Sequence, residues 1–474
     1  MKQLSPMDSA FLALETATMT GNISSLLILD PSDVEGEFDL GRLMSFVATR
    51  IERVPVFRQR MATVPLGLDR PYWVDDERFD LSYHVRESAL PSPGDMSQLL
   101  ELVGRLQERP LDMSRPLWET YLITGLPDDR VAIFTKTHHV VIDGVSGMEV
   151  LGALIDLDPA APAGEAAVFE PRSAPSGAGM VARSLVHLAG RPGDAWTIAT
   201  GLVRWLPGLV ALTAAKPRNP LQRKTSQQSQ AGDSLPVRTP VTSFNAKISR
   251  RRRVGVTDLP LADIKQVKTA FGTSVNDVVM AVVAGALRRW LLHDGGVLSQ
   301  PLVAMVPVAV HSPDRSTQGN YVTAMLATLP THLDDPLRRL KRSSKFSKAA
   351  KRSGGAVPPN VLVSAMEFAP PMILGAASRA VWDGGLFRAM RPFNLVISNV
   401  PGGTQDVYLA GARLERMYPV SVVVDGMGMN VTLLGHKDTL HLGITTCPEL
   451  VPDPQQICDW AREELQLLLE ASTA

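Results

Sequence analysis

The sequence has little cysteine and no unbroken apolar run of membrane-spanning length. Two cysteines, Cys447 and Cys458, occur among 474 residues without any CxxC pair, which predicts neither a disulfide framework nor a thiolate metal site. The N-terminus has no apolar core of signal-peptide length. The most apolar segment, residues 180–215, is interrupted by charges and two prolines, so no uncharged part reaches the roughly 18 residues that a membrane span needs. We expect a protein made and kept in a reducing cytoplasm.

An excess of charge of one sign is also absent. Lys+Arg and Asp+Glu both number 48, so the net charge favours no nucleic-acid partner and any electrostatic targeting must be local. The sequence has no GxSxG nucleophile elbow, Walker A loop or HExxH motif. Hydrophobic residues make up 45% and charged residues 20%, which is typical of a globular chain with two or three domains at this length.

What the sequence does contain is a pair of adjacent histidines, His138 and His139, between a predicted strand over residues 131–137 and a helical pattern that begins at Gly144. Adjacent side chains on a strand point to opposite faces, so one imidazole can reach a cavity while the other braces the turn. A histidine is the most frequent general base near neutral pH, because its ordinary pKa is about 6.5. Asp143 could orient an imidazole or hold the loop through an arginine, and Gly144 leaves room for a close approach.

Two other interpretations of the histidine pair stay open at this point. The histidines can be ordinary residues of a strand end, with Asp143 as a helix N-cap. A metal site is disfavoured, because two adjacent strand residues cannot both face one ion without a bulge.

The spacing HHxxxDG, formed by His138, His139, Asp143 and Gly144, is the signature of the CoA-dependent acyltransferase superfamily. The wider sequence resembles one branch of it, the bacterial wax ester synthase/acyl-CoA:diacylglycerol acyltransferases. The segments that carry this resemblance appear in the family's order along nearly the whole chain: Leu4 to Leu12 with Glu15, Phe79 to Val85, Arg115 to Glu119, Thr273 to Val279 running into Ala286 to Arg288, Ser398 to Gly402, and Tyr418 to Val420.

The resemblance implies a layered α/β (α+β) fold of two similar chloramphenicol-acetyltransferase-like domains, joined by a crossover, with a tunnel between them. The active histidine would lie midway along the tunnel, where a dry channel protects the thioester. The implied reaction is transfer of a long-chain acyl group from acyl-CoA to diacylglycerol, giving triacylglycerol, or to fatty alcohols, giving wax esters. Acyl-CoA is then a substrate, and no cofactor or metal is expected. The rivals are a condensation-type enzyme acting on carrier-bound or amine acceptors, and a catalytically silent lipid-binding paralogue.

The resemblance also implies residue roles. His139 would be the general base, with His138, Asp143 and Gly144 supporting its orientation. Ser274 and Asp277 also match an S-x-x-D capping box, so part of the Asn276-Asp277 signal is structural. Either Asn276 or Ser398-Asn399 is a candidate oxyanion donor. The candidate substrate-binding residues are Pro116, Leu117, Trp118, Asn276, Asp277, Ser398, Asn399, Pro401 and Gly402.

The hydrophobic pattern predicts a first domain over residues 1–157, a linker with an apolar helical connector over 158–239, and a second domain over 240–474. Helices are expected after Asp39, over 96–110, 261–271 and 274–292, and from Pro454. Strands are expected over 23–29, 118–123, 131–137, 302–310, 322–329, 395–398, 428–434 and 440–446.

Three segments are candidates for contact with a lipid surface or with CoA phosphates. Residues 180–215, followed by the basic residues Lys216, Arg218, Arg223 and Lys224, can lie on a bilayer or connect the domains. Eight basic residues between Arg338 and Arg352 form either a solvated face or a contact for CoA phosphates or anionic lipid, and Arg250 to Arg253 allows the same two interpretations. We expect peripheral association with the inner face of the plasma membrane or with lipid droplets.

Overall fold

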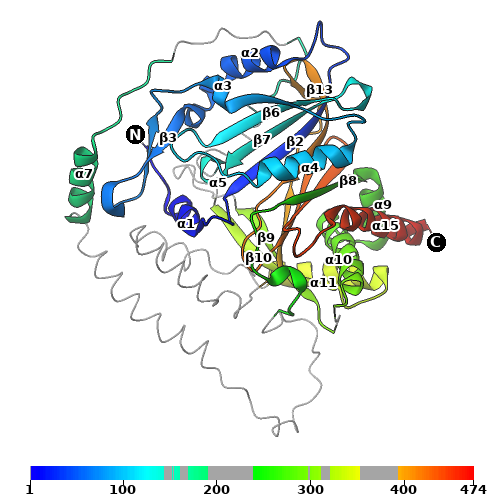
Figure 1. Ribbon diagram of the computed structural model, residues 1–474. Helices are drawn as coiled ribbons and strands as arrows, with labels where there is room; N and C mark the ends of the chain where they lie inside the picture. The colour runs from blue at the N-terminus through cyan, green and yellow to red at the C-terminus, as the bar shows by residue number, and fades with distance from the viewer. Residues whose placement is uncertain are drawn as a thin grey trace.

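Two six-stranded mixed sheets organise the computed structural model, which describes residues 2–142, 152, 154–160, 169–189, 239–296, 299–310, 321–352 and 393–473 (Figure 1). The N-terminal sheet has the strand order β12-β13-β2-β7-β6-β5, and the C-terminal sheet has the order β10-β9-β11-β14-β15-β8. A small third sheet has the order β1-β4-β3. Parallel and antiparallel pairs occur in both large sheets, as expected of a layered α/β fold.

The N-terminal sheet buries apolar side chains on both faces. One face packs against α2, which begins after its N-cap Asp39, and the other packs against α4, which begins with a capping box of Asp95 and Gln98. The strands of this lobe are β1 (Lys2–Gln3), β2 (Asn22–Asp30), β3 (Gln59–Ala62), β4 (Tyr72–Asp75), β5 (Val85–Ala89), β6 (Trp118–Thr124), β7 (Val131–His138), β12 (Tyr408–Leu409) and β13 (Ala412–Val420). Its helices are α1 (Pro6–Leu14), α2 (Leu40–Arg50), α3 (Leu81–His84), α4 (Met96–Gln107), α5 (His139–Ile142) and α7 (Gly177–Ala189).

The C-terminal sheet carries its helices over one core. The buried face of α10 lies between the sheet and its neighbouring helices, and the capping box predicted at Ser274 and Asp277 is present. The strands are β8 (Arg253–Pro260), β9 (Leu302–Val310), β10 (Tyr321–Leu329), β11 (Leu395–Val400), β14 (Met429–His436) and β15 (Thr439–Thr446). The helices are α9 (Leu261–Phe271), α10 (Val275–His293), α11 (Pro336–Arg352) and α15 (Pro454–Thr473).

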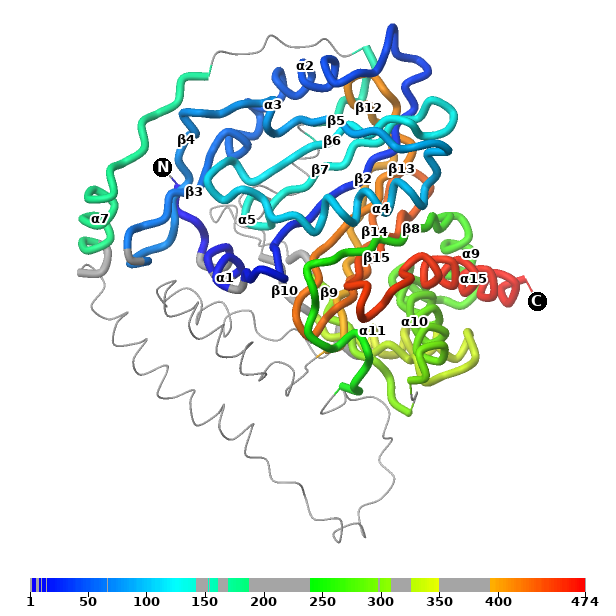
Figure 2. The backbone as a smooth tube through the Cα atoms, viewed as in Figure 1, coloured from blue at the N-terminus to red at the C-terminus, as the bar shows by residue number. Residues whose placement is uncertain are grey.

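The C-terminal half of the chain donates two strands to the N-terminal sheet. After β11 the chain leaves the C-terminal sheet, forms β12 at the edge of the N-terminal sheet and β13 between β12 and β2, and returns as β14 and β15 (Figure 2). The Tyr418 hydroxyl of β13 donates to Asp258 of β8 (3.1 Å), and Asp258 also contacts Nδ1 of His441 on β15 (2.7 Å). Strand β13 is therefore hydrogen-bonded into one sheet and attached by side chains to the other.

The predicted strands and helices named above are confirmed wherever they fall on described residues. The helix expected from Gly144 and most of the apolar connector lie outside the described residues; within the connector, α7 begins at Gly177. The strands that were not predicted are β1, β3, β4, β5, β8, β12 and β13. No single helix in the described ranges is long and apolar enough to cross a membrane, whereas α9 and α10, bent by 104° at their junction, reach that length and composition only together.

Candidate active site

The histidine pair lies at the end of β7, between β2 and β6. His138 is the last residue of the strand and His139 begins α5. The His138 amide donates to the Leu117 carbonyl (3.0 Å), and the His139 amide donates to the Gly21 carbonyl (2.8 Å). The backbone of each histidine is thus held from a different neighbouring segment.

His138 is buried and its imidazole is bonded at both nitrogens. The amide of Val140 donates to Nδ1 (3.2 Å), and Nε2 lies 2.9 Å from Oε1 of Glu15. Because Nδ1 accepts a hydrogen bond, the proton of the neutral ring is on Nε2 and is donated to the Glu15 carboxylate. The one lone pair of this ring is therefore already used, and a side chain in that state orients its surroundings rather than accepting a proton from a substrate.

His139 has a different environment. Its residue is half-buried, and its ring stacks on the ring of Phe11 in α1, with centroids 4.6 Å apart and planes inclined by 26°. Its Nδ1 atom is shielded from solvent. Asp143 and Gly144, the remaining members of the motif, lie outside the described residues.

The Pro116-Leu117-Trp118 segment is buried. The indole of Trp118 lies between the rings of Phe57 (4.8 Å) and His84 (4.6 Å), and its Nε1 donates to the Phe57 carbonyl (2.8 Å). His84 Nδ1 contacts the Trp118 carbonyl (2.8 Å), and burial lowers the pKa of His84 below its ordinary value. Trp118 is therefore a core residue. This segment contacts the histidine pair through the Leu117 carbonyl, which accepts from the His138 amide.

Asn276 and Asp277 occupy the first turn of α10. The Asp277 carboxylate accepts from the Ser274 amide (2.9 Å), and the Asp277 amide donates to the Ser274 hydroxyl (3.2 Å). Asp277 is buried, whereas Asn276 is half-buried. These bonds account for the capping function of Asp277 and leave the amide of Asn276 as the less constrained polar group of the turn.

The Ser398-to-Gly402 segment runs along β11 and beyond its end. Ser398 and Asn399 lie in parallel register with residues of β14, and Pro401 and Gly402 are exposed. A Cβ at Gly402 would lie 1.6 Å from the Gly435 carbonyl oxygen, so glycine is required for this close approach. No hydrogen bond or ion pair within the described part of the chain joins this segment, or the start of α10, to the histidines.

Three residues around the histidines were not recognised from the sequence as parts of the site: Phe11, Glu15 and Gly21. Phe11 and Glu15 were identified only as part of a segment that carries the family resemblance, and no sequence signal pointed to Gly21. The contact between Glu15 and His138 spans 123 positions, and no local spacing predicts such a pair.

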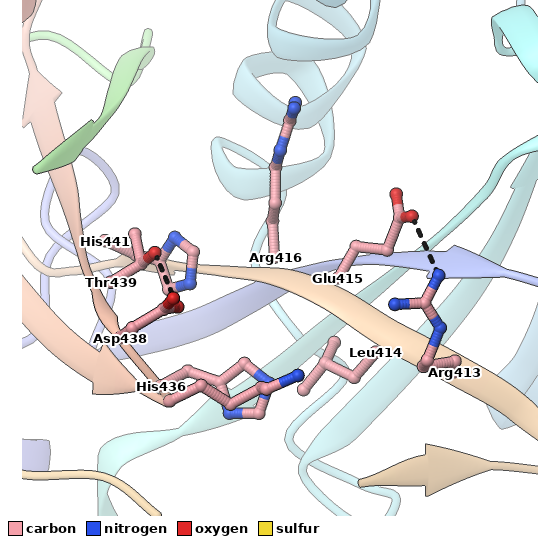
Figure 3. A pocket seen from close by; sticks show the side chains of 9 residues that line it. Arg413, Leu414, Glu415, Arg416, His436, Asp438, Thr439 and His441 are labelled. Carbon is pink, nitrogen blue, oxygen red and sulfur yellow. Dashed lines mark hydrogen bonds and ion pairs between the residues drawn. The ribbon is translucent and has the colours of Figure 1, made fainter. Parts of the chain in front are cut away.

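A pocket of about 290 Å³ lies elsewhere, between β13 and the β14–β15 hairpin (Figure 3). Strand β2 spans the distance between the two places: its residue Asn22 is paired with His138 of β7, and its residue Asp30 is paired with Arg413 of β13, which lines the pocket. Eight steps of extended strand separate those two positions, which corresponds to roughly 26 Å. The pocket is therefore remote from the histidine pair. Its lining consists of Arg413, Leu414, Glu415, Arg416, His436, Lys437, Asp438, Thr439 and His441.

Comparisons with known proteins cover the whole chain. Residues 4–279 match the model of the wax ester synthase/diacylglycerol acyltransferase catalytic domain, and residues 318–469 match that of the WS/DGAT C-terminal domain. A protein of Mycobacterium tuberculosis (strain CDC 1551 / Oshkosh) assigned as a diacylglycerol O-acyltransferase is 35% identical over 100% of this chain and 91% of its own length. Another protein so assigned, from M. tuberculosis (strain ATCC 25618 / H37Rv), is 34% identical over 99% of both chains.

The solved structures agree with the predicted fold. The wax ester synthase/diacylglycerol acyltransferase from Marinobacter aquaeolei VT8 is 27% identical, with a TM-score of 0.73 over 100% of both chains. The first condensation domain of the calcium-dependent antibiotic synthetase is 16% identical, with a TM-score of 0.55 over 99% of this chain and 95% of that domain, and this likeness concerns the fold alone. The prediction of two chloramphenicol-acetyltransferase-like domains is confirmed.

Proposed function

The chain belongs to the wax ester synthase/diacylglycerol acyltransferase family, and from this premise we propose that it transfers a long-chain fatty acyl group from acyl-CoA to the hydroxyl of diacylglycerol. Relatives that match the chain over its full length and are assigned as diacylglycerol O-acyltransferases support this acceptor. Long-chain alcohols are the second acceptor class, because the matched catalytic model describes both activities.

The observation that carries the mechanism is the different bonding of the two histidines. His138 has its lone pair directed at the Val140 amide and its proton directed at Glu15. His139, half-buried at the strand end and stacked on Phe11, is then the imidazole assigned to proton transfer. In this assignment His138 is a positioning residue, and Asp143 and Gly144 support the turn.

The reaction needs no covalent enzyme intermediate. His139 removes the proton from the acceptor hydroxyl while the hydroxyl oxygen attacks the thioester carbonyl. The C–S bond then breaks, the ester forms, and His139 returns the proton to the departing CoA sulfur. General-base catalysis of this kind contributes about a hundredfold to ten-thousandfold.

Alignment and oxyanion donors supply the rest of the acceleration. For the oxyanion we retain Asn276 and the Ser398-Asn399 pair as alternative donors, because their amide and hydroxyl hydrogens can be donated, whereas the Asp277 carboxylate only accepts hydrogen bonds and accepts one from the Ser274 amide in the helix cap. Leu117 acts through its carbonyl on His138, and Trp118 supports it from the core. Pro401 and Gly402 frame the end of β11, and the tunnel between the domains remains part of this proposal.

Acyl transfer from labelled palmitoyl-CoA tests the function. Purified protein is given dioleoylglycerol or hexadecanol, and we expect ester product with at least one of them. His139→Ala should lose nearly all product while remaining folded. The control is His293→Ala, which removes an exposed imidazole at the end of α10 and should leave the rate unchanged. Product formation that survives His139→Ala would remove the assignment of the base.

Two outcomes of the same assay favour the rival functions. Transfer only to an amine or a carrier-bound acceptor would favour a condensation-type enzyme. Binding of acyl-CoA without any transfer would favour a silent lipid-binding paralogue.

We further propose that the protein is cytoplasmic and attaches peripherally to the inner face of the plasma membrane or to lipid droplets. Helix α11 supports this proposal, because its sequence contains eight basic residues and no acidic one. Four of the basic residues, Arg338, Lys341, Lys345 and Lys348, are exposed at spacings that place them along one helical face. Each such cation contributes about 1 kcal/mol near an anionic surface.

Flotation with phosphatidylserine-containing liposomes tests the attachment. We expect binding at low salt that weakens at high salt and in Lys341→Gln/Lys348→Gln. The matched control is Lys265→Gln/Lys268→Gln, which removes two exposed lysines from α9. Equal binding by both double variants, or no flotation at low salt, would contradict a role for α11.

A further inference from the structure

The segment that precedes β2 holds both histidines at once. Glu15 is the C-cap residue of α1, and its Oε1 accepts from Nε2 of His138 (2.9 Å) and from the amide of Gly21. The carbonyl of the same Gly21 accepts from the His139 amide (2.8 Å). One carboxylate oxygen therefore fixes the ring of the first histidine and, through one glycine, the backbone of the second.

Helix α1 adds a contact to the second ring. Phe11 lies four residues before Glu15, which places both side chains on one face of the helix and its cap. Phe11 stacks on His139 while Glu15 binds His138. Each histidine is thus met by a different side chain of the same short segment.

The space at Gly21 is as restrictive as the hydrogen bonds. A Cβ at this position would lie 2.9 Å from Nε2 of His138 and 3.3 Å from Oε1 of Glu15. Any side chain at residue 21 would separate the carboxylate from the imidazole. The local sequence is therefore suited to a carboxylate–imidazole contact at this place.

From this geometry we infer that Glu15 is a positioning residue of the acyltransferase reaction: it accepts the Nε2–H of His138 and so fixes the orientation of that ring, and through Gly21 it fixes the start of α5 from which His139 projects. The inference rests on the function proposed above. Glu15 touches no reacting atom in this account, and its effect reaches the chemistry only through the orientation of His139. A displacement of about 1 Å at a catalytic group can lower the rate about a hundredfold.

Three substitutions separate this role from simple support of the fold. Glu15→Ala removes both hydrogen bonds and should lower kcat about a hundredfold, by the geometric argument just given, with KM changed little. Glu15→Gln keeps a carbonyl oxygen for both donors but loses the charge, so we expect a folded protein with a loss of tenfold or less, because charge-assisted bonds are about twice as strong as neutral ones. Phe11→Leu should lower kcat about two- to tenfold through loss of stacking.

The matched control is Glu52→Gln, a carboxylate in the same lobe that is 42% exposed and lies 3.5 Å from Arg58. It should leave both kcat and KM at the wild-type values. A role in folding alone would lower the yield or the unfolding midpoint of Glu15→Ala without lowering kcat per folded molecule. That result, or Glu15→Gln falling as far as Glu15→Ala, would overturn the inference.

A second measurement does not require product. Nitrogen NMR of histidine-labelled protein reports ring tautomers, and the His138 signal is assigned by its loss in His138→Gln. We expect the Nε2–H tautomer in the wild type and in both Glu15 variants, because the Val140 amide still donates to Nδ1. Only in Glu15→Ala should the Nε2–H proton, which no longer has a carboxylate acceptor, move upfield and exchange faster with water. An Nε2–H proton signal unchanged in Glu15→Ala would refute the hydrogen-bond assignment even if no transfer were detected, whereas a wild-type protein that shows the bonded Nε2–H signal but makes no ester would refute the proposed function instead.

Discussion

Substitution of Gly21 by alanine is expected to damage the active site and the stability of the N-terminal lobe together. The added Cβ would lie 2.9 Å from Nε2 and 3.0 Å from Cε1 of His138, whereas ordinary contacts begin at 3.4 Å. The imidazole must therefore retreat by about 0.5 Å, the difference between 3.4 and 2.9. It has little freedom to do so, because the ring is buried and bonded on both sides.

The size of the effect follows from overpacking and misplacement. Forcing a methyl group into a packed site costs about 1–3 kcal/mol of the free energy of unfolding. A shift of half an ångström, passed to His139 through the Gly21 carbonyl, should lower kcat about tenfold, given about a hundredfold per ångström. Urea unfolding measures the first quantity, and ester formation from palmitoyl-CoA at saturating acceptor measures the second.

A second glycine in the same lobe provides the matched control. Gly41 is exposed in the first turn of α2, and a Cβ there would meet its nearest neighbour, a carboxylate oxygen of Asp39, at an ordinary 3.4 Å. Gly41→Ala should keep wild-type activity and gain up to about 1 kcal/mol, because alanine is the better helix former. If Gly21→Ala retained kcat within about twofold and lost less than about 0.5 kcal/mol of the free energy of unfolding, the argument that His138 has no room for an added Cβ would be wrong.

Three further expectations concern a buried ion pair, a buried histidine and the caps of two helices. Glu464→Ala removes the carboxylate that contacts Arg289 (3.0 Å) and the buried Arg339, and should lower the free energy of unfolding, measured in urea, by about 3–5 kcal/mol. The double variant Arg339→Leu/Glu464→Leu leaves no buried charge unpaired and should lose clearly less stability, so equal losses would contradict a buried-charge penalty. Burial lowers the pKa of His84 in the folded protein, so below the ordinary histidine pKa of about 6.5 the unfolded chain binds more protons than the folded chain. The contribution of His84 to stability is therefore complete above that pH and is lost as the pH falls through the folded pKa. Urea midpoints measured across this range should depend less on pH in His84→Phe than in the wild type. Ser274→Ala and Asp95→Ala each remove a capping box and should each lower the free energy of unfolding by about 1 kcal/mol. If Asn276 borders the reacting atoms, only Ser274→Ala should also lower kcat. Equal values of kcat in the two variants would count against that placement of Asn276.

Elements whose signals are local were predictable from the sequence. The alternating residues 131–137 predicted β7, and the S-x-x-D pattern predicted both the start and the cap of α10. A difference in environment between the two histidines was also expected from strand geometry, although His139 begins α5 and lies just beyond the strand on which that expectation rested. Such features depend on residues within a few positions of one another, and a single sequence contains that information in full.

The place of β13 in the N-terminal sheet could not be predicted in the same way. The register of β13 against β2 shifts between Leu414 and Arg416, and this irregularity breaks the period-two pattern by which a strand is recognised. Two arginines and a glutamate at the start of β13 resemble a solvated loop, although the structure pairs Arg413 with Asp30 (2.8 Å). The partner of such a strand is chosen by packing between segments that lie hundreds of residues apart, and no spacing rule reports it.

Trp118 illustrates a different limit of sequence reading. Its place beside Pro116 and Leu117 in a family segment predicted a residue of the substrate channel. The structure instead gives its indole two aromatic neighbours and a backbone acceptor inside the core. A motif position that is required for folding and one that contacts substrate look alike in a sequence, and only the side-chain environment separates them.

The position of the histidine pair depends on both halves of the chain. Strand β2 is bonded on one side to β7, which ends at His138, and on the other to β13, which comes from residues 412–420. A segment ending at residue 157, the predicted boundary of the first domain, would lack β13 and leave one edge of β2 unpaired next to the strand that carries the site. Open edges of this kind promote association with other chains. The C-terminal half therefore supplies a strand that completes the sheet behind His138, and Tyr418 of that strand binds Asp258 of the other sheet. The alignment of His139 with groups of the C-terminal lobe consequently depends on β2 and β13, together with the direct packing of β8 against α4.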